Sequence, residues 1–267
     1  MTTISFSKYQ GAGNDFIMID DRRGDLEPQM TTEWIARACD RHFGVGADGM
    51  ILLQTGKDGA DFFMRYYNSD GRTSTFCGNG GRCIVAYAGQ LKVHAGSCRF
   101  LGTDGWHDGQ VLAEGTIALS MADVHHINTI DENTFILQTG SPHFVTFLQD
   151  INELDVRAAG REVRYGPAFA KEGINVNFAQ RIGPAEIAVR TYERGVEDET
   201  LACGTGVVAT ALAAAYASPD PQHSWLIHAR GGDLQVEFQR EGPQVFNQVK
   251  LIGPAVESFR GEIILSV

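Results

Sequence analysis

Short segments of alternating or continuously apolar residues recur along the chain, bounded by glycine, aspartate and asparagine. Runs of four to eight such residues are typical of β-strands. The pattern therefore predicts a protein made mostly of strands. The predicted strands are 16–20, 50–54, 61–68, 116–121, 134–139, 174–180, 186–192, 225–229, 234–239, 246–251 and 262–265.

Three segments have helical patterns instead. The first, 32–43, starts at a threonine that can cap a helix and carries apolar residues at helical spacing, among them Trp34 and Ala38. The other two helices begin at Gly78 and Gly204 and are apolar on nearly every face after their first turn. Helices of that composition are buried, so each is expected inside its own part of the fold.

The two buried helices belong to an internal repeat. A strand ending at Asn68 is followed, nine residues later, by Cys77-Gly78-Asn79-Gly80, and a strand ending at Glu193 is followed, ten residues later, by Cys203-Gly204-Thr205-Gly206. The repeat predicts an α+β fold of two pseudo-symmetric domains, each a mostly antiparallel sheet rolled around a central helix. The first domain is expected at 1–122 with a closing strand from 256–267, and the second at 123–255, with 123–130 as the crossover.

Length and composition agree with two domains and narrow the function. The 267 residues are 43% hydrophobic and 21% charged, as in ordinary globular proteins. A formal net charge of −11 argues against a nucleic-acid partner, which would need a basic surface. The N-terminus has no apolar stretch of the signal-peptide kind, and the longest run of small apolar residues, 207–217, is far below the ~20 that span a bilayer. A cytoplasmic protein without a membrane partner is expected.

Cysteine and histidine spacing predicts neither a disulfide framework nor a metal site. Five cysteines are an odd number, and no Cys-x-x-Cys pair occurs, so the usual zinc spacing is absent. The pair His125-His126 has no clustered carboxylates or cysteines beside it and is expected in a solvated loop. We therefore expect free thiols that either pack in the core or react.

Two glycine-rich segments match weak motifs. The segment 44–49 fits the dinucleotide pattern G-x-G-x-x-G, but a helix precedes it and a strand follows, which is the reverse of the order that the motif requires. It is interpreted as a turn. The segment 11–16 is also interpreted as a turn between strands, although its glycines can present Asn14 to a ligand.

The repeated cysteines differ from the other three. Cys39, Cys83 and Cys98 are interpreted as packing residues, because they lie inside helical patterns or at the start of a strand. Cys77 and Cys203 each lie at the start of a helix, where the macrodipole stabilises an anion and lowers the pKa of a thiol. The glycines that follow allow backbone N–H groups to approach a bound carboxylate. Because the same Cys-Gly-x-Gly context occurs twice, Cys77 and Cys203 are predicted to be reactive thiols and not packing residues.

A pair of such thiols can invert a stereocentre. A thiolate on one face of an α-carbon removes its proton, while a thiol on the other face delivers one. No cofactor is needed if donors at the helix N-termini stabilise the negative charge that develops on the carboxylate. A single nucleophilic cysteine with a histidine base would not explain the duplication.

The ordered set of motifs resembles diaminopimelate epimerase over essentially the whole chain. Each motif is weak by itself, but the combination in this order is highly specific. The motifs are 11–16, 44–49, 64–71 with 77–80, Pro142-His143, Asn175-Val176-Asn177-Phe178, Tyr192-Glu193-Arg194-Gly195 and 199–206.

This resemblance implies interconversion of LL- and meso-2,6-diaminopimelate, on the route to lysine and peptidoglycan, without pyridoxal phosphate or metal. It implies an active site at the domain interface, Cys77 and Cys203 as the acid/base pair, and a homodimer. The family pattern places the reacting carboxylate near Gly78, Asn79, Gly204 and Thr205. It places the distal amino and carboxylate groups near Asn14, Asn68, Asn175, Glu193 and Arg194, and His143 near the reacting centre.

Two departures from the family pattern affect substrate contacts. Ser141 stands before Pro142-His143 where the family commonly has asparagine, so a shorter hydroxyl, a water or no group replaces that amide. The loop 195–199 is one residue longer than the common form, and it adds acidic residues beside the expected site.

Other functions remain as alternatives. Proline and hydroxyproline racemases also use two cysteines, but their substrates lack a distal pair of amino and carboxylate groups. In such an enzyme the side chains expected to bind that pair would have no ligand: Asn14, Asn175, Glu193 and Arg194. Phenazine-biosynthesis-type isomerases do not use the paired cysteines. A non-catalytic amino-acid-binding protein that kept the scaffold is a third alternative, and a redox protein using a Cys77–Cys203 disulfide is a fourth.

Overall fold

The computed structural model describes residues 2–74, 76–219 and 222–265. The chain divides into two compact units: residues 1–119 with 254–267 form unit 1, and residues 120–253 form unit 2. The division expected from the sequence differs from this one by three residues at the first boundary and by two at the second. Each unit is described by itself.

Unit 1 contains one sheet with the strand order β17-β1-β2-β3-β4-β5-β6-β7. The pairs β2–β3 and β4–β5 are parallel and the others are antiparallel. Helix α1 lies between β2 and β3 in the chain, and helix α2 between β4 and β5. The elements are β1 Thr2–Gly11, β2 Asn14–Asp20, η1 Glu27–Gln29, α1 Thr32–Cys39, β3 Gly49–Thr55, β4 Phe62–Asn68, α2 Gly78–Gln90, β5 Ser97–Gly102, β6 Gly105–Val111, β7 Ile117–Ser120 and β17 Val256–Leu265.

Unit 2 repeats this arrangement with the strand order β8-β9-β10-β11-β12-β14-β15-β16. Its parallel pairs are β10–β11 and β12–β14, and helices α3 and α4 make the two crossovers. The elements are β8 Ile127–Asp131, β9 Thr134–Gln138, β10 Pro142–Phe147, α3 Val156–Arg164, β11 Asn175–Gly183, β12 Glu186–Glu193, β13 Asp198–Thr200, α4 Gly204–Ala217, β14 Ser224–Ala229, β15 Gly232–Arg240 and β16 Phe246–Gly253.

The order of parallel and antiparallel pairs is the same in the two units, strand for strand. The last strand, β17, takes the edge position beside β1 that β8 takes beside β9. The repeat seen in the sequence is therefore a repeat of the whole α+β unit. The expected fold class is confirmed.

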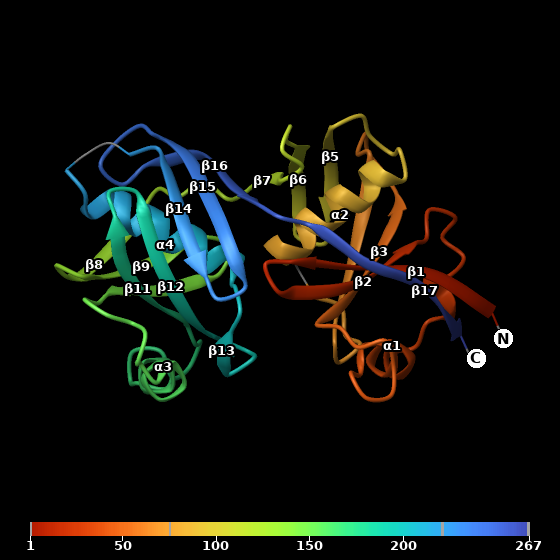
Figure 1. Ribbon diagram of the computed structural model, residues 1–267, viewed down its shortest axis with the longest axis horizontal. Coiled ribbons are helices and arrows are strands. Elements are labelled where there is room, and N and C mark those ends of the chain that lie inside the picture. The colour runs from red at the N-terminus through yellow and green to blue at the C-terminus, as the bar shows by residue number, and fades with distance from the viewer. Residues whose placement is uncertain (1, 75, 220–221, 266–267) are drawn as a thin grey trace. The chain divides into compact units, whose positions relative to one another are not determined.

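The central helix of each unit is buried on nearly all sides. Ten of the 13 residues of α2 and 11 of the 14 residues of α4 are buried. Figure 1 shows α4 enclosed by the strands of its unit, while α1 and α3 lie outside their sheets. A helix that is apolar on nearly every side has no face for water, so enclosure by a rolled sheet suits its composition.

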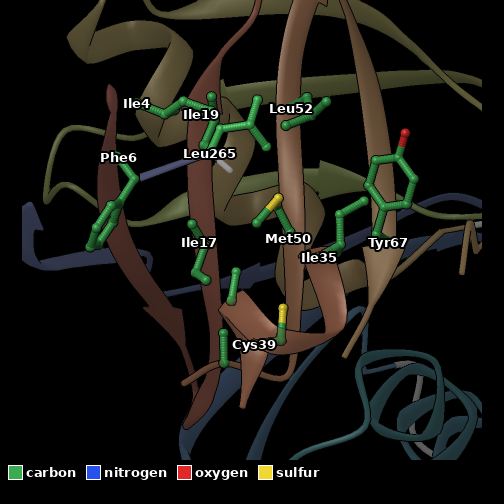
Figure 2. Packing of buried hydrophobic residues seen from close by; sticks show 12 residues of the cluster. Ile4, Phe6, Ile17, Ile19, Ile35, Cys39, Met50, Leu52, Tyr67 and Leu265 are labelled. Atoms are coloured by element: carbon green, nitrogen blue, oxygen red, sulfur yellow. The ribbon is translucent and has the colours of Figure 1, made fainter. Parts of the chain in front are cut away.

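The outer helices cover a second hydrophobic cluster in each unit. In unit 1, Ile35 and Cys39 of α1 pack against buried residues of the sheet such as Ile17 and Met50, as Figure 2 shows. In unit 2, α3 contributes Val156 to a cluster with Val176 of β11 and Tyr192 of β12. Each fully buried aliphatic side chain contributes roughly 1.5–3 kcal/mol, so these clusters fix the outer helices on the sheets.

The observed elements differ from the predicted ones in a few places. Helix α1 ends at Cys39, four residues before the predicted end, because the Asp40 carboxylate accepts hydrogen bonds from the N–H groups of His42 and Phe43 and turns the chain. Part of the predicted crossover 123–130 is strand β8. The sequence pattern missed η1, β6, β10, β13 and α3 altogether. Strands β1 and β5 were expected only as the strand before the turn at 11–16 and as the strand that Cys98 begins, without bounds.

Candidate functional site

Cys77 and Cys203 occupy the same structural position in their units. Each is the N-cap of its central helix, with extended backbone angles (φ −126° and ψ 119° for Cys77; φ −110° and ψ 110° for Cys203). The first intrahelical hydrogen bonds run from Gly81 N to Cys77 O at 2.7 Å and from Val207 N to Cys203 O at 2.9 Å. The N–H groups of each first turn come before these bonds in the chain, so they have no partner within the helix. They form the positive end of the helix dipole. Both sulfurs are therefore placed where an anion is stabilised.

In unit 1 the sulfur of Cys77 meets Asn14. The thiol donates to Asn14 Oδ1 at 3.4 Å, and Asn79 Nδ2 donates to the same oxygen at 3.5 Å. Asn14 opens β2 immediately after a two-residue turn, Ala12-Gly13, in which both residues have positive φ (54° and 84°). Such a turn follows the twist of a hairpin. The segment 11–16 is thus a turn between strands, as interpreted from the sequence, and it also brings Asn14 to Cys77.

A network of charges behind Asn14 fixes the orientation of its amide. Asn14 Nδ2 donates to the Asp48 carboxylate, which can only accept, so Oδ1 faces Cys77. Arg41 binds both Asp48 at 2.8 Å and Asp15 at 2.7 Å, and Lys8 pairs with Asp15. Although burial opposes ionisation, hydrogen bonds from Arg41 and Lys8 lower the pKa of Asp15 to about 2. The segment 44–49, a turn after α1, supplies Asp48 to this network.

In unit 2 the sulfur of Cys203 meets a buried chain of polar side chains. Thr205 Oγ1 lies 3.5 Å from Cys203 Sγ and 2.8 Å from His143 Nε2. Thr139 Oγ1 donates to the Thr205 carbonyl at 2.8 Å and ties the start of α4 to the end of β9. His143 is completely buried on β10. The structure therefore joins His143, Thr205 and Cys203, three of the predicted site residues.

Asn175 and Arg194 are also in contact. Asn175 Oδ1 accepts from the Arg194 backbone N–H at 2.9 Å, and its Nδ2 donates to the Pro142 carbonyl at 3.1 Å. The Arg194 guanidinium donates through Nη1 to the Glu172 carbonyl at 3.0 Å. Glu193, the last residue of β12, is half-buried beside it. These contacts fix the backbone and the guanidinium of Arg194 at the end of β12.

Asn68 and Ser141 have simpler surroundings. Asn68 is exposed at the end of β4, where its backbone closes a turn with Gly71 and Arg72. The carbonyl of Ser141 accepts from the backbone N–H of Thr139 at 3.2 Å. Among the described residues of its own unit, neither side chain has a hydrogen bond or ion pair with another predicted site residue.

The carboxylates of the longer loop, 195–199, form ion pairs with arginines. Glu197 pairs with Arg164 at 3.4 Å, Asp198 with Arg157 at 3.9 Å, and Glu199 with Arg190 at 2.8 Å. Glu197 also accepts from Tyr192 Oη at 3.0 Å and from the Gly195 backbone N–H at 3.1 Å. Each of the three acidic residues of 195–199 thus has an arginine partner within unit 2.

The other three cysteines are buried thiols. All five cysteines of the chain are free, and burial raises the pKa of Cys39, Cys83 and Cys98 to about 12. A thiol with such a pKa has almost no thiolate near neutral pH and is inert. This agrees with their interpretation as packing residues.

Neither a metal cluster nor a membrane span is present in the described ranges. No group of three or more His, Cys, Asp or Glu side chains there is arranged to hold a metal ion. No helix there has the length and apolar character needed to cross a bilayer. His125 and His126 are exposed, and His126 bonds to Asn128 and Gln244.

Because His143 is buried, we expect the folded protein to lose stability at acid pH. Burial lowers the pKa of His143 from 6.5 to about 3, and the positive charge of Arg194 adds to the shift. Between these values the unfolded chain binds a proton that the folded chain does not, so stability is lost as the pH falls below about 6.5. For each unit by which the pH falls within that window, we expect His143 to lower the free energy of unfolding by about 1.4 kcal/mol.

Urea unfolding of the wild type and of His143→Gln at pH 7, 6 and 5 and one protein concentration measures this contribution. The stability advantage of the wild type over the variant should shrink as the pH falls. A constant difference across the three pH values would show that His143 titrates equally in the folded and unfolded chains.

Comparison with known proteins identifies the class first. Over 99% of this chain and 100% of the other, the fold matches a phenazine biosynthesis protein of the PhzF family from Bacillus anthracis, with a TM-score of 0.73 and 15% identity. It also matches a probable proline racemase from Agrobacterium radiobacter K84, with a TM-score of 0.68 and 11% identity over 98% of this chain and 93% of the other. At such identities the likeness establishes the fold alone. The class identified in this way is a fold class, which includes proteins described as a phenazine biosynthesis protein and as a probable proline racemase.

The sequence comparisons identify the family within that class. The family model described as diaminopimelate epimerase matches residues 6–127 and 135–256. A diaminopimelate epimerase from Flavobacterium psychrophilum is 45% identical over 248 residues, which are 93% of this chain and 95% of that protein. Another from Chlorobaculum tepidum is 37% identical over 96% of this chain and 99% of its own length. The chain belongs to the diaminopimelate epimerase family, and the resemblance inferred from its motifs is confirmed.

Sequence reasoning missed several residues that surround the two thiols. Asp48, Arg82 and Asn177 contact predicted site residues, and Thr191 contacts Asn177, but none of the four was singled out as part of the site. The segment around Asn177 was recognised only as a family motif. Asn177 lies between apolar residues of β11, which was the available signal for it, whereas Thr191 follows Arg190 in β12 and had no such signal.

Proposed function

We propose that this enzyme inverts an α-carbon of 2,6-diaminopimelate, interconverting the LL and meso isomers on the route to lysine and peptidoglycan. Cys77 and Cys203 act from opposite faces of that carbon. The observation that carries the proposal is the matched pair of N-cap cysteines on α2 and α4, each followed by glycine, in a member of this family. The reaction as proposed uses no cofactor, and the working form is a homodimer.

The chemistry requires only the two thiols and the helix ends. The thiolate takes the α-proton and forms an S–H bond, and the electron pair of the broken C–H bond is delocalised into the adjacent carboxylate. Backbone N–H groups at Gly78, Asn79, Gly204 and Thr205 stabilise that charge. The second thiol then gives its proton to the opposite face. The two cysteines exchange protonation states in each turnover, so the reverse reaction starts from the product form.

Arg194 and Glu193 are proposed to hold the distal end of the substrate. A guanidinium can bind a carboxylate through two hydrogen bonds, and a glutamate can pair with an ammonium group. The contact with the Glu172 carbonyl uses only Nη1 of Arg194. Asn14, Asn68 and Asn175 are proposed to complete the distal contacts, with Ser141 in place of the family's common asparagine.

Isotope exchange tests the proposed reaction directly. Reduced protein is incubated with LL-diaminopimelate in D₂O without added cofactor, and L-proline and hydroxyproline are run in parallel. Meso product carrying deuterium at the inverted carbon supports the proposal. Exchange on proline alone would move the function to a racemase of that kind. Silence on every substrate from folded protein with free thiols would favour a binding protein.

Replacement of Arg194 should weaken substrate binding more than it slows chemistry. Arg194→Met removes charged hydrogen bonds worth about 1.5–3 kcal/mol, so KM should rise about tenfold to a hundredfold while kcat changes little. Steady-state kinetics with LL-diaminopimelate measures the split. The control is Arg157→Met, because Arg157 is exposed and pairs only loosely with Asp198. An unchanged KM for Arg194→Met would remove this residue from the distal site.

A further inference from the structure

The polar chain behind Cys203 extends deeper into unit 2 than the predicted site residues. Asn177 Nδ2 lies 3.1 Å from His143 Nδ1 and donates to the Phe144 carbonyl at 3.0 Å. Thr191 Oγ1 donates to Asn177 Oδ1 at 3.0 Å. Asn177 is fully buried and Thr191 nearly so. Side chains of β10, β11, β12 and α4 therefore form one continuous hydrogen-bonded chain.

Fixed acceptors and donors give this chain a direction. The Phe144 carbonyl can only accept, so the amide nitrogen of Asn177 must face it, and the threonine hydroxyl then donates to the amide oxygen. The second hydrogen of that nitrogen points to His143 Nδ1, which must act as an acceptor. A neutral imidazole that accepts at Nδ1 carries its proton on Nε2. His143 therefore donates to Thr205, and the Thr205 hydroxyl is left to donate to Cys203 Sγ.

At the equivalent positions of unit 1, two of the three side chains have no hydrogen-bonding atom. The strand registers place Phe16 where unit 2 has His143, Ile51 where it has Asn177, and Tyr66 where it has Thr191. The helix glycines show the same correspondence. A Cβ at Gly80 would lie 2.9 Å from Ile51 Cδ1, and a Cβ at Gly206 would lie 2.3 Å from Asn177 Oδ1.

The repeated fold thus accepts an apolar side chain at two of these positions and an aromatic one at the third. Burying polar groups costs free energy even when they are paired, so the fold alone does not account for the chain in unit 2.

We infer that Asn177 is a positioning residue that holds His143 as the Nε2–H tautomer, so that Thr205 donates a hydrogen bond to Cys203 Sγ. This inference rests on the proposed function and explains how one of its two thiols is activated. A hydrogen bond to the charged form of a group favours that form, so the chain stabilises the thiolate of Cys203. His143 supplies a fixed donor and takes no proton during turnover.

The charge around His143 supports a neutral ring. Arg194, at the end of β12, is the charged group that acts on His143, and its positive field opposes a second proton on the imidazole. The neighbours within hydrogen-bond distance, Asn177 and Thr205, are both uncharged. The donor chain therefore keeps its direction across the neutral pH range.

Nitrogen NMR tests the tautomer without reference to activity. In protein labelled with ¹⁵N-histidine, the His143 signals are assigned by their absence in His143→Gln. We expect a protonated Nε2 and an unprotonated Nδ1 at pH 6 to 9, with and without LL-diaminopimelate. A protonated Nδ1, or an imidazolium that appears on adding substrate, would overturn the inference.

Thiol alkylation tests the consequence for Cys203. The Cys77→Ala protein is treated with iodoacetamide over a range of pH, and modification of Cys203 is followed by peptide mass. Adding Asn177→Leu removes the group that fixes the tautomer, so alkylation at pH 7 should slow about tenfold while the rate at high pH stays the same. Identical pH profiles would overturn the inference.

A second pair of variants covers the case in which Asn177→Leu fails to fold. Thr191→Val removes the donor that orients the Asn177 amide, and Thr191→Ser keeps it. Only the valine variant should shift the alkylation profile to higher pH. A shift with both variants would indicate a packing effect and reject the directional chain. Because alkylation and NMR do not depend on turnover, the expected shift together with a wild-type protein that lacks epimerase activity would contradict the proposed function and leave this inference standing.

Discussion

Cys77→Ala and Cys203→Ala each lower the rate of epimerisation at least about a thousandfold, while the protein still folds. The expected loss is large because inversion needs a base on one face of the α-carbon and an acid on the other. Either variant lacks one of the two. The measurement is formation of meso-diaminopimelate from the LL isomer at saturating substrate.

Isotope exchange makes this prediction sharper. Each variant keeps one thiol, which can remove the α-proton from one isomer and return deuterium to the same face. We therefore expect solvent deuterium in only one isomer without inversion, and the opposite isomer for the other variant. Cys98→Ala is the control, since Cys98 is buried on β5 and packs against β6. Full epimerisation by either single variant would contradict the two-base mechanism.

The sequence predicted the central helices and the repeat because their signal is local. Gly78–Gln90 and Gly204–Ala217 are too apolar to be anywhere but inside, and the cysteine that precedes each marks its start. The missed elements, and those expected without bounds, have weak local signals. Strand β1 buries the polar residues Ser7 and Lys8, and Lys8 is tolerated there because it pairs with Asp15 and Gly46. Burial of that kind depends on partners that sequence periodicity does not reveal.

Helix α3 was missed for a related reason. Val156, Ala159 and Val163 lie at helical spacing, but they are the few apolar residues of a short segment that is otherwise rich in charge, and only Val156 and Gly160 are buried. The helix is stabilised instead by Asp155, whose side chain accepts from Ala158 N at 2.9 Å, and by packing of its few apolar residues on β11 and β12. Tertiary contacts decide whether such a segment forms a helix.

The residues of the candidate site also fall into two groups, those marked by a local sequence pattern and those that are not. Cys77, Cys203 and Asn14 could be named from the sequence because glycines and helix starts mark them. Asn177 and Arg82 could not, because a hydrogen bond between distant strands, or the burial of a charge, has no local pattern. The residues that set the properties of the two thiols lie in this second group.

Arg82 is the residue that distinguishes the surroundings of Cys77. It is fully buried on α2, and its guanidinium donates through Nη2 to Asn79 Oδ1 at 2.9 Å and through Nε to the Pro254 carbonyl at 3.4 Å. Its Nη1 has no hydrogen-bond partner among the residues that the structure describes, and no carboxylate there pairs with it. Burial lowers the pKa of Arg82, whereas the thiols of Cys83 and Cys77 act to raise it.

A buried cation without a carboxylate is costly to the fold, so its benefit must come from another source. The same electrostatic interaction that raises the pKa of Arg82 favours the thiolate of Cys77. The position five residues after Cys203 on α4 is the buried Val208, which shows that this site in the repeated helix accepts an apolar side chain. We expect Cys77 to be activated by a nearby charge, and Cys203 by donated hydrogen bonds.

Arg82→Met should therefore separate stability from activity. The free energy of unfolding should be unchanged or higher, because an uncompensated buried charge is replaced by an apolar side chain of similar length. The value of kcat should fall about tenfold to a hundredfold, and the acid limb of its pH profile should move to higher pH, since a nearby opposite charge changes a thiol pKa by about one to three pH units. Urea unfolding and pH-dependent kinetics measure the two effects.

Arg82→Lys is the matched control, because it keeps the charge and loses the planar set of donors. It should recover most of the shift in the pH profile, while Met should not. A Met variant that loses stability along with activity would mean that Arg82 only supports the packing around Gly11 and Asn79. Retention of both the wild-type rate and the wild-type pH profile would show that the helix N-terminus alone activates Cys77. Recovery by Lys together with a stable, slow Met variant would mean that unit 1 accepts the cost of a buried charge to make its thiol acidic.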